Sequence, residues 1–269
     1  LCGALGAEVH GIDLSQDMGP ANCSKIKDAF HENIVLLFRE QCLTPAQLVS
    51  FTSCFGPVEP HPLGSREGAL SQPEILVLEN RADIPAPRND FWHSDISFAE
   101  CPPLGSVLHA LEVPGRGLGD TLFCNMYSVL EELSPGLQKT LEGLCALHSA
   151  ENLVSRNNED DNNAKPIASI PSMVSHPVVR THPETGRKAL YVNPYYTVSF
   201  VGWTPEESRL LIDWLMQLAT RQENIYRHSW CQGDVLMWGN RCAMHYAVYD
   251  YGSKTRLFHR ATAAGDRPV

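Results

Sequence analysis

Apolar and polar positions along the chain predict a few helices set among many short strands. Residues 21–33 carry apolar side chains at helical spacing, and the apolar run Ile34–Phe38 that follows is typical of a buried strand. Thr44-Pro45-Ala46-Gln47 predicts the start of a second helix, because Thr can cap it, Pro suits the first turn and Gln can reach back to the cap. This helix is expected to end near Cys54.

Short segments of β type, separated by Pro and Gly, dominate the middle of the chain. The predicted strands are Ile75–Glu79, Ser106–Glu112, Thr121–Asn125, Val178–His182 and Lys188–Asn193. Ser128–Leu144 is predicted as an interposed helix. The strongly polar segment Glu151–Lys165 is predicted as a mobile loop.

The last third of the chain repeats the same alternation of a helix with strands. Thr204-Pro205-Glu206-Glu207 predicts a second capped helix through about Gln222. Its apolar residues are expected on one face: Leu210, Leu211, Trp214, Leu215 and Leu218. The strands expected after it, at the spacing of a sandwich or barrel, are Ile225–Trp230, Asp234–Trp238, Met244–Val248 and Arg256–Thr262.

Composition indicates an ordinary globular protein, with 43% hydrophobic and 19% charged residues in 269. This length suits one large domain or two small ones. The formal net charge of -10 and the lack of any basic run argue against nucleic acid as a partner. An anionic substrate would therefore have to be held by individual, well-placed arginines.

The nine cysteines form no CxxC pair and predict reduced, mostly buried thiols, which favours a cytoplasmic location. No charged-then-apolar leader opens the chain, and no run of about 18 apolar residues occurs, so neither secretion nor a membrane partner is expected. Because the sequence begins at Leu1, a removed leader stays open. The number of subunits also stays open, a homo-oligomer included.

Candidate metal ligands come from two distant segments. His93 and Asp95 lie two apart among aromatic and β-branched residues, and on a strand such positions face the same side. His245 is a candidate third ligand, far along the chain. Two His and one carboxylate on one face of an ion leave open positions, which suits iron(II) that activates oxygen, although zinc accepts similar ligands.

Each of these pieces alone has a plainer interpretation. His and Asp two apart occur by chance in many proteins, and a lone His near a C-terminus is more often packed or on the surface. Downstream of His245, however, lie Arg256 and Arg260, whose spacing of four places both on one face of a strand. The guanidinium group of an arginine matches a carboxylate with two hydrogen bonds and stays charged in a dry cavity. The plainer alternative is that these arginines form ion pairs with Asp or Glu at the surface.

Taken together, the motifs resemble the taurine dioxygenase and 2,4-dichlorophenoxyacetate dioxygenase family. The resemblance rests on their order and separation along nearly the whole chain, from an N-terminal Gly3–Glu8 segment onward. The motifs are His93-Ser94-Asp95, Gly119-Asp120-Thr121, the stretch 176–183, and His245 followed by Arg256 and Arg260.

The resemblance implies a mainly β fold with flanking helices, a double-stranded β-helix or cupin-like jelly roll, as a single domain over residues 1–269. It implies that His93, Asp95 and His245 bind Fe(II), and that Arg256 and Thr121 bind the co-substrate 2-oxoglutarate. With O2, such an enzyme hydroxylates its substrate and releases succinate and CO2. No catalytic residue beyond the metal site is implied.

The same resemblance implies a small anionic organic substrate, either a sulfonate such as taurine or an aryloxyalkanoate-like carboxylate. The implied substrate-binding residues are His61, Asn89, Ile96, Phe123, Tyr196 and Arg260. Gly64 stands where the taurine enzymes carry Tyr, which points away from taurine itself. Residues 150–166, together with Pro62–Ser71, are predicted to close over the bound substrate as a lid.

Two rival functions use the same residues differently. A zinc-dependent hydrolase would employ the three ligands with a metal-bound water, but it leaves Arg256 and Thr121 without a task. A non-catalytic jelly-roll binding module would not need an intact ligand set. The remaining histidines without a partner at metal spacing are expected to be structural: His148, His176, His182, His228 and His259.

Overall fold

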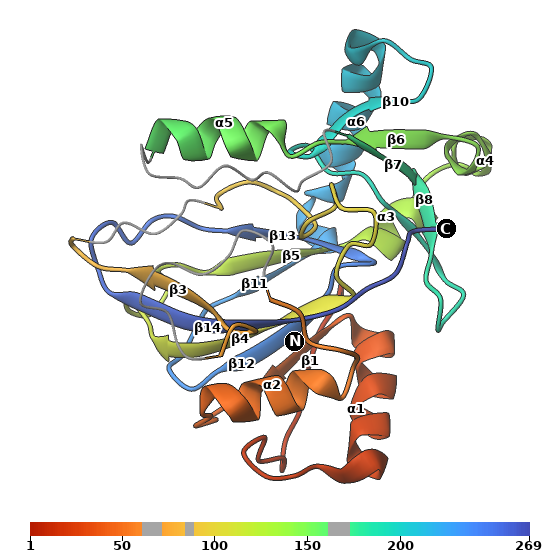
Figure 1. Cartoon of the computed structure of the whole chain (residues 1–269). Helices are drawn as coiled ribbons and strands as arrows, with labels where there is room; N and C mark the ends of the chain where they lie inside the picture. The colour runs from red at the N-terminus through yellow and green to blue at the C-terminus, as the bar shows by residue number, and fades with distance from the viewer. Residues whose placement is uncertain (61–71, 84–88, 161–172) are drawn as a thin grey trace.

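A six-stranded sheet with the order β1-β2-β12-β4-β14-β3 is the largest sheet of the molecule. The computed structural model in which it is seen describes residues 1–60, 72–83, 89–160 and 173–269 (Figure 1). The strands of this sheet are β1 (Ala7–Glu8), β2 (Val35–Phe38), β3 (Leu76–Asn80), β4 (Gly105–Glu112), β12 (Val235–Gly239) and β14 (Arg256–Ala263). All neighbours pair antiparallel except β1 and β2, which are parallel.

The two faces of this sheet bury different partners, because successive side chains of a strand point in opposite directions. On β12, Val235 and Met237 pack with the N-terminal helices α1 (Gly19–Asn33) and α2 (Pro45–Ser53), which lie below the sheet in Figure 1. Leu236 and Trp238 face the opposite way into the main core. On β14, Phe258 belongs to that same core, so the side of β14 that carries Arg256 and Arg260 also faces inward.

A three-stranded sheet with the order β11-β5-β13 lies on the inner side of the large sheet (Figure 1). Its strands are β5 (Thr121–Asn125), β11 (Ile225–His228) and β13 (Ala243–Ala247). In the antiparallel pairing of β13 with β5, His245 lies opposite Phe123 and Ala247 lies opposite Thr121. This register places three of the predicted site residues on two neighbouring strands that face β14, with His245 on β13 and with Phe123 and Thr121 on β5.

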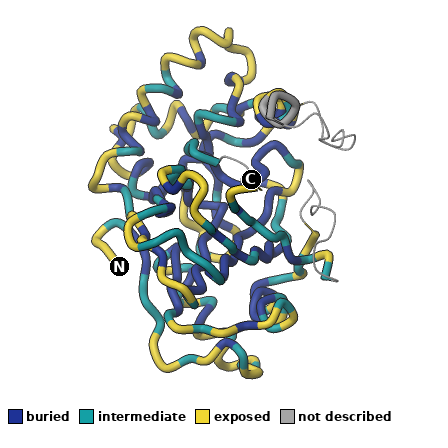
Figure 2. The backbone as a smooth tube through the Cα atoms, turned by 90° about the vertical axis from the view of Figure 1, so that its left-hand side faces the viewer, coloured by how far each residue is buried: buried dark blue, intermediate teal, exposed yellow. Residues whose placement is uncertain are grey.

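The remaining elements form a separate layer beside the two sheets. A small sheet with the order β10-β6-β7 and a β8–β9 hairpin pack with four helices (Figure 1). The bounds are α3 (Met126–Glu131), α4 (Pro135–Glu142), β6 (Cys145–His148), α5 (Glu151–Asp160), β7 (Val174–Pro177), β8 (Val179–Thr181), β9 (Lys188–Leu190), β10 (Thr197–Phe200) and α6 (Pro205–Ala219), with a short 3-10 turn at Gln222–Asn224. Figure 2 shows buried backbone running through the centre, with exposed segments along the outer turns.

Both predicted capping boxes are confirmed, as are the strands β2, β3, β4, β5, β8, β9, β11, β12, β13 and β14 to within a few residues. The helix expected over Ser128–Leu144 is wrong as a single element. It is divided at Ser134, which caps α4, because the residue before Pro135 disfavours helical geometry and Pro135 has no backbone N–H to continue a helix. Strands β6, β7 and β10 were not predicted at all.

The expected apolar face of α6 is only partly buried. Leu215 and Leu218 lie in the core, whereas Leu210 and Trp214 are exposed. The face that packs inward is rotated to include Ser208, whose hydroxyl accepts from the backbone N–H of Phe200 and donates to the carbonyl of Thr204. A serine whose hydroxyl is hydrogen-bonded therefore occupies a buried position of α6, which the pattern of apolar residues alone did not predict.

The segment Glu151–Lys165 was predicted as a loop. Its first ten residues form helix α5, so the prediction is wrong for them. Just before the helix, the hydroxyl of Ser149 accepts from the backbone N–H of Glu151 at 3.1 Å. Leu153 and Val154 of α5 pack in a small cluster with Ile96 and Tyr196. The rest of the predicted lid, residues 161–166, and the second lid segment, residues 62–71, lie outside the described residues.

Cysteine chemistry differs from the prediction. A disulfide joins Cys23 of α1 to Cys54 after α2, with Cα atoms 5.6 Å apart. Both helices cover the same face of the large sheet, and this tertiary packing brings together residues that sequence spacing does not pair. The other seven cysteines are free, as expected, but five of them are exposed and only Cys124 and Cys242 are buried, so the expectation of mostly buried thiols is wrong.

No helix in the described part of the chain is both long enough and apolar enough to cross a membrane.

Candidate active site

His93 and His245 are joined by a single antiparallel bridge. The backbone N–H of each donates to the carbonyl of the other, at 3.0 and 2.8 Å, and the two ring centroids lie 4.1 Å apart. The predicted strand through His93 and Asp95 is reduced to this bridge. Immediately afterwards the chain turns at Ile96, whose φ of 51° is uncommon for a β-branched residue.

Three buried ligand atoms converge at this bridge. Nε2 of His93 and Nε2 of His245 lie 3.7 and 3.6 Å from Oδ1 of Asp95. These three residues form a group whose ligand atoms lie within 4.8 Å of one another, as a metal ion requires. Nδ1–H of His93 donates to the carbonyl of Phe91 at 2.8 Å, which leaves Nε2 with its lone pair toward the centre.

The second carboxylate oxygen of Asp95, Oδ2, is held by the side chains of Arg260 and Ser106. Oδ2 pairs with Nη2 of Arg260 at 2.6 Å and accepts from the hydroxyl of Ser106 at 3.0 Å. Burial opposes ionisation of Asp95, but the charge and hydrogen bond of the Arg260 guanidinium outweigh it and hold the pKa of this carboxyl well below its usual range. Asp95 is therefore a carboxylate, with one oxygen facing the histidines.

The donor set fits Fe(II). Burial lowers the pKa of both His93 and His245, so both imidazoles are neutral near pH 7 and can each offer a lone pair. Two neutral imidazoles and one carboxylate on one side of an ion leave its other positions for oxygen and a chelating co-substrate.

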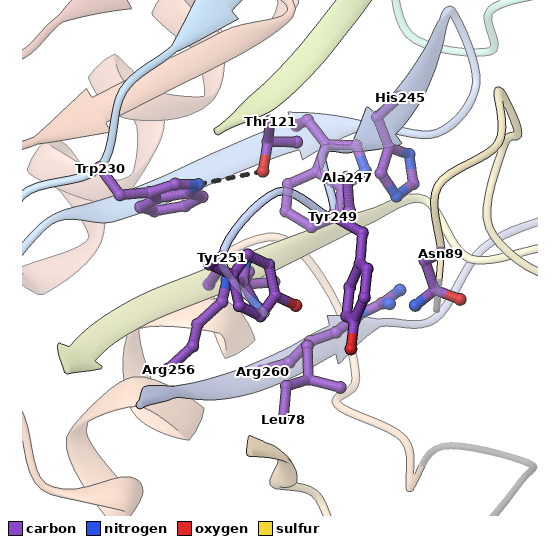
Figure 3. Close-up of a pocket in the computed structure, with 12 residues that line it drawn as sticks. Leu78, Asn89, Thr121, Trp230, His245, Ala247, Tyr249, Tyr251, Arg256 and Arg260 are labelled. Atoms are coloured by element: carbon purple, nitrogen blue, oxygen red, sulfur yellow. Dashed lines mark hydrogen bonds between the residues drawn. The ribbon is translucent and has the colours of Figure 1, made fainter. Parts of the chain in front are cut away.

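A pocket opens beside this triad between β14 and the β5–β13 pair (Figure 3). Its lining residues are Leu78, Asn89, Leu108, Thr121, Trp230, Trp238, His245, Ala247, Tyr249, Tyr251, Arg256 and Arg260. Both predicted arginines thus enter one pocket, as their spacing on a strand indicated. Thr121 and Asn89 reach it as well.

Arg256 is a buried cation that pairs with no carboxylate in the described part of the chain. Its side chain is 8% exposed, it makes no ion pair with any described residue, and its Nε has no hydrogen-bond partner among them. The guanidinium lies over the ring of Phe258 at 4.0 Å and near that of Tyr251 at 5.6 Å. Burial lowers the pKa of Arg256, the direction expected of a charge that lacks an anion.

Gly119, the first residue of the Gly119-Asp120-Thr121 motif, lies close to the Arg256 side chain. Its φ is +66°, and a Cβ at this position would lie 3.1 Å from the Tyr251 ring and 3.3 Å from Nε of Arg256. A glycine is thus needed both for the backbone conformation and for the close approach of the arginine. Asp120, the next residue, accepts from Nε of Arg227 at 2.7 Å on the adjacent strand.

Other predicted substrate residues lie near the triad but outside this pocket. Phe123 is fully buried and stacks on His245 at 6.2 Å, and Tyr196 lies 6.1 Å from the ring of His93. Ile96 packs with Tyr196 under α5. His61 and Gly64 lie outside the described residues.

Sequence reasoning missed the aromatic residues of the loop after β13. Tyr249 and Tyr251 line the pocket, and Asn80 fixes their loop by donating from Nδ2 to the carbonyls of Gly252 and Lys254, at 2.9 and 2.7 Å. The sequence signal was the alternation Tyr249-Asp250-Tyr251 close after the distal histidine. Trp238, predicted as a core aromatic, is buried and also lines the pocket.

Among the histidines expected to be structural, His182 has possible ligand partners nearby that the sequence did not indicate. His182 lies with His31 and Glu184 in a second group whose ligand atoms are within 4.8 Å of one another. The Glu184 carboxylate of this group already accepts from Nη1 of Arg241 at 2.8 Å, so a fixed cation is in place there. His228 is held by Asp234 at 3.2 Å and His148 by Ser97 at 3.1 Å, in agreement with structural roles.

Comparison with known proteins agrees with this geometry. Residues 1–262 match the model of the family described as "Taurine catabolism dioxygenase TauD, TfdA family". The chain belongs to this family. It is therefore an α-ketoglutarate-dependent dioxygenase, an oxidoreductase that uses Fe(II), 2-oxoglutarate (α-ketoglutarate) and O2.

Individual relatives cover nearly the whole chain. An alkylsulfatase of Acinetobacter baylyi is 34% identical over 99% of this chain and 84% of its own length. An α-ketoglutarate-dependent 2,4-dichlorophenoxyacetate dioxygenase of Cupriavidus pinatubonensis is 34% identical over 98% of this chain and 96% of its own. A crystal structure of AAD-2 in complex with Mn(II) and N-oxalylglycine is 30% identical, with a TM-score of 0.87, and covers 98% of this chain and 96% of that one.

Proposed function

We propose that His93, Asp95 and His245 hold Fe(II), and that Arg256 with Thr121 binds the far carboxylate of 2-oxoglutarate in this dioxygenase. The observation that carries the proposal is the buried guanidinium of Arg256, which faces the pocket without an anionic partner among the described residues. A dicarboxylate would supply that partner, because a planar fork of N–H groups matches a carboxylate with two parallel hydrogen bonds. A hydrolase with zinc would leave this cation uncompensated.

Once bound, the metal supplies the activation of O2 that couples decarboxylation of 2-oxoglutarate to hydroxylation of the substrate. The side chains of the protein hold the proposed metal ligands in place and exclude water. Ser106 and Arg260 hold Asp95 so that Oδ1 faces the two histidines, and Phe91 fixes the tautomer of His93. Phe123 and Trp238 pack against the His245 ring and exclude water from that side.

The substrate is proposed to be a small organic anion that enters beside Arg260 and Asn89. The pocket combines these polar groups with the apolar surfaces of Leu78, Tyr249 and Tyr251, which suits an anionic head on an apolar alkyl or aryl body. The names of the alkylsulfatase and the 2,4-dichlorophenoxyacetate dioxygenase describe substrates of that kind. Sulfate esters, sulfonates and aryloxyalkanoates are therefore the classes to test.

We further propose that the six-stranded and three-stranded sheets form a jelly-roll core, with residues 1–269 as one domain. The support is the antiparallel pairing of β12, β4 and β14 in one sheet, of β11, β5 and β13 in the other, and the shared core between them. A cytoplasmic location, a homo-oligomeric state and a lid at residues 150–166 stay predictions.

The deciding experiment measures succinate formed from 2-oxoglutarate with Fe(II) and ascorbate, over a panel of sulfate esters, sulfonates and aryloxy acids. Substrate-dependent succinate is expected, and Arg256→Ala should raise the KM for 2-oxoglutarate by about 100-fold or more, since a buried carboxylate loses a charged partner worth about 3 kcal/mol. Arg256→Lys, which keeps the charge and loses the fork, should fall between. Hydrolysis supported by Zn(II) alone, or an unchanged KM in Arg256→Ala, would overturn the proposal.

A further inference from the structure

Trp230 lines the pocket next to Thr121. Strand β11 pairs with β5 so that His228 is opposite Thr121, and Trp230 follows two residues later, just past the end of the strand. Its indole ring is 3% exposed, and Nε1–H donates to the hydroxyl oxygen of Thr121 at 3.0 Å (Figure 3). Thr121 lies on β5 and Trp230 follows β11, and their side chains meet in the pocket.

This contact has a consequence for the Thr121 proton. A hydroxyl has one proton to donate and two lone pairs with which to accept. The indole, which can only donate, occupies a lone pair, and no described residue accepts the proton of Thr121. The Thr121 hydroxyl therefore has its proton available to a ligand, in the same pocket as the donors of Arg256.

Residues that precede and follow Trp230 in the chain are held by Asp234. Nε2–H of His228 and the backbone N–H of Cys231 both donate to Oδ2 of the fully buried Asp234, at 3.2 and 2.9 Å. Arg39 donates to the same oxygen at 2.8 Å. The residues that bracket Trp230 are thus tied to one carboxylate anchored on the large sheet.

The indole ring is also clamped by two aromatic contacts. It lies perpendicular to His228 at 4.5 Å and edge-on to Phe258 at 4.8 Å. Phe258 is the residue whose ring lies under the guanidinium of Arg256. One aromatic layer therefore connects the anchor of Trp230 to the buried arginine, and it leaves the ring little freedom to rotate away from Thr121.

We propose that Trp230 is a positioning residue for 2-oxoglutarate, whose indole N–H orients the Thr121 hydroxyl so that this hydroxyl and Arg256 donate together to the far carboxylate. The inference rests on the proposed function of the pocket and adds a residue to it. Trp230 acts through Thr121 and needs no contact with the metal.

Calorimetric binding of N-oxalylglycine to the Mn(II)-loaded protein tests the inference without turnover. Trp230→Phe, which keeps an aromatic ring and removes the N–H, is expected to weaken binding about threefold to tenfold, the worth of one hydrogen bond. Thr121→Val should weaken it by at least as much. The double variant should bind like Thr121→Val alone, because both changes remove the same donor to the carboxylate.

In steady-state kinetics, Trp230→Phe should raise the KM for 2-oxoglutarate and leave kcat nearly unchanged. Trp203→Phe, on the partly exposed turn before α6, is the matched control and should match the wild type. Unchanged binding in Trp230→Phe, or effects of the two single variants that multiply in the double variant, would overturn the inference. Failure of the wild-type protein to bind N-oxalylglycine would instead overturn the proposed function and this inference with it.

A second measurement does not depend on folding of a Trp230 variant. In Zn(II)-loaded protein labelled with ¹⁵N-tryptophan, Thr121→Val should shift the indole N–H resonance of Trp230, and N-oxalylglycine should shift it in wild type but much less in Thr121→Val. The resonance of Trp203 should stay in place throughout. A Trp230 resonance that is indifferent to Thr121→Val would overturn the inference.

Discussion

Nη2 of Arg260 lies 2.6 Å from Oδ2 of Asp95, in a buried ion pair that includes one of the three proposed iron ligands. Arg260 was expected to bind the anionic group of the substrate, and it does line the pocket. Its pairing with Asp95 gives it a second task, because the same guanidinium fixes the orientation of a metal-binding carboxylate. Under the proposed function, the substrate and the metal would therefore share one arginine.

Arg260→Ala is accordingly expected to weaken metal binding as well as substrate binding. Residues that hold a metal ligand from behind are typically worth 10- to 100-fold in metal affinity, so we expect about a tenfold rise in the Kd for Mn(II), measured by calorimetry on the purified protein. Slow decarboxylation of 2-oxoglutarate without substrate should persist at saturating Fe(II). Arg260→Lys should retain most of the metal affinity and lose most of the substrate response.

Ser106→Ala separates the two tasks of Arg260. The Ser106 hydroxyl donates to Asp95 and accepts from Arg260 at 2.8 Å, but Ser106 does not line the pocket. We expect it to weaken Mn(II) binding modestly and to leave the KM of the organic substrate unchanged. Metal affinity that is equal in wild type and Arg260→Ala would contradict the double role and leave Arg260 to the substrate alone.

Gly119→Ala should damage the 2-oxoglutarate side of the pocket. Two costs apply: a φ of +66°, and a methyl group only 3.3 Å from Nε of Arg256. Gly117 offers a matched control, since it also has a positive φ of +77° but nothing lies within 4 Å of an added Cβ. Both variants should lose about 1 kcal/mol of unfolding free energy from the backbone term.

Only Gly119→Ala is expected to raise the KM for 2-oxoglutarate as well, because only its methyl group displaces Arg256. Urea denaturation and steady-state kinetics on the two variants give the comparison. Equal KM values in Gly117→Ala and Gly119→Ala would mean that Arg256 is not placed by this glycine.

Much of the site could be predicted because strand geometry is simple. The spacing of four between Arg256 and Arg260 required only that β14 be a strand to put both on one face, and the structure confirms it. The pair His93 and Asp95 converges for a different reason than expected. A single bridge to His245 followed by a turn at Ile96 brings the atoms together, and this turn depends on contacts that local sequence does not encode.

What sequence reasoning missed depends on tertiary contacts. Tyr251 enters the pocket because Asn80, far away in the chain, holds its loop by two hydrogen bonds. The apolar periodicity of α6 predicts a helix, but its inward face carries Ile212 and Met216 together with the hydrogen-bonded Ser208. Helical periodicity gives the helix, and only packing decides its rotation.

The stability of the fold is expected to fall in mild acid because of His148. This residue is fully buried, its Nδ1 is bonded to Ser97 and its Nε2 has no partner among the described residues. Burial, with a smaller contribution from His176, lowers the pKa of His148 to about 3 from an ordinary 6.5. The unfolded chain therefore takes up a proton below pH 6.5 that the folded chain refuses until about pH 3.

As pH falls from 6.5 toward 3, the unfolded state gains protons first and the unfolding free energy decreases. One such histidine contributes a slope of at most about 1.4 kcal/mol per pH unit. His148→Asn, which can keep a hydrogen bond to Ser97 but cannot be charged, should flatten the dependence between pH 6.5 and 5. Urea denaturation of both proteins across that range measures the difference, and parallel curves would show that His148 is not the group that titrates.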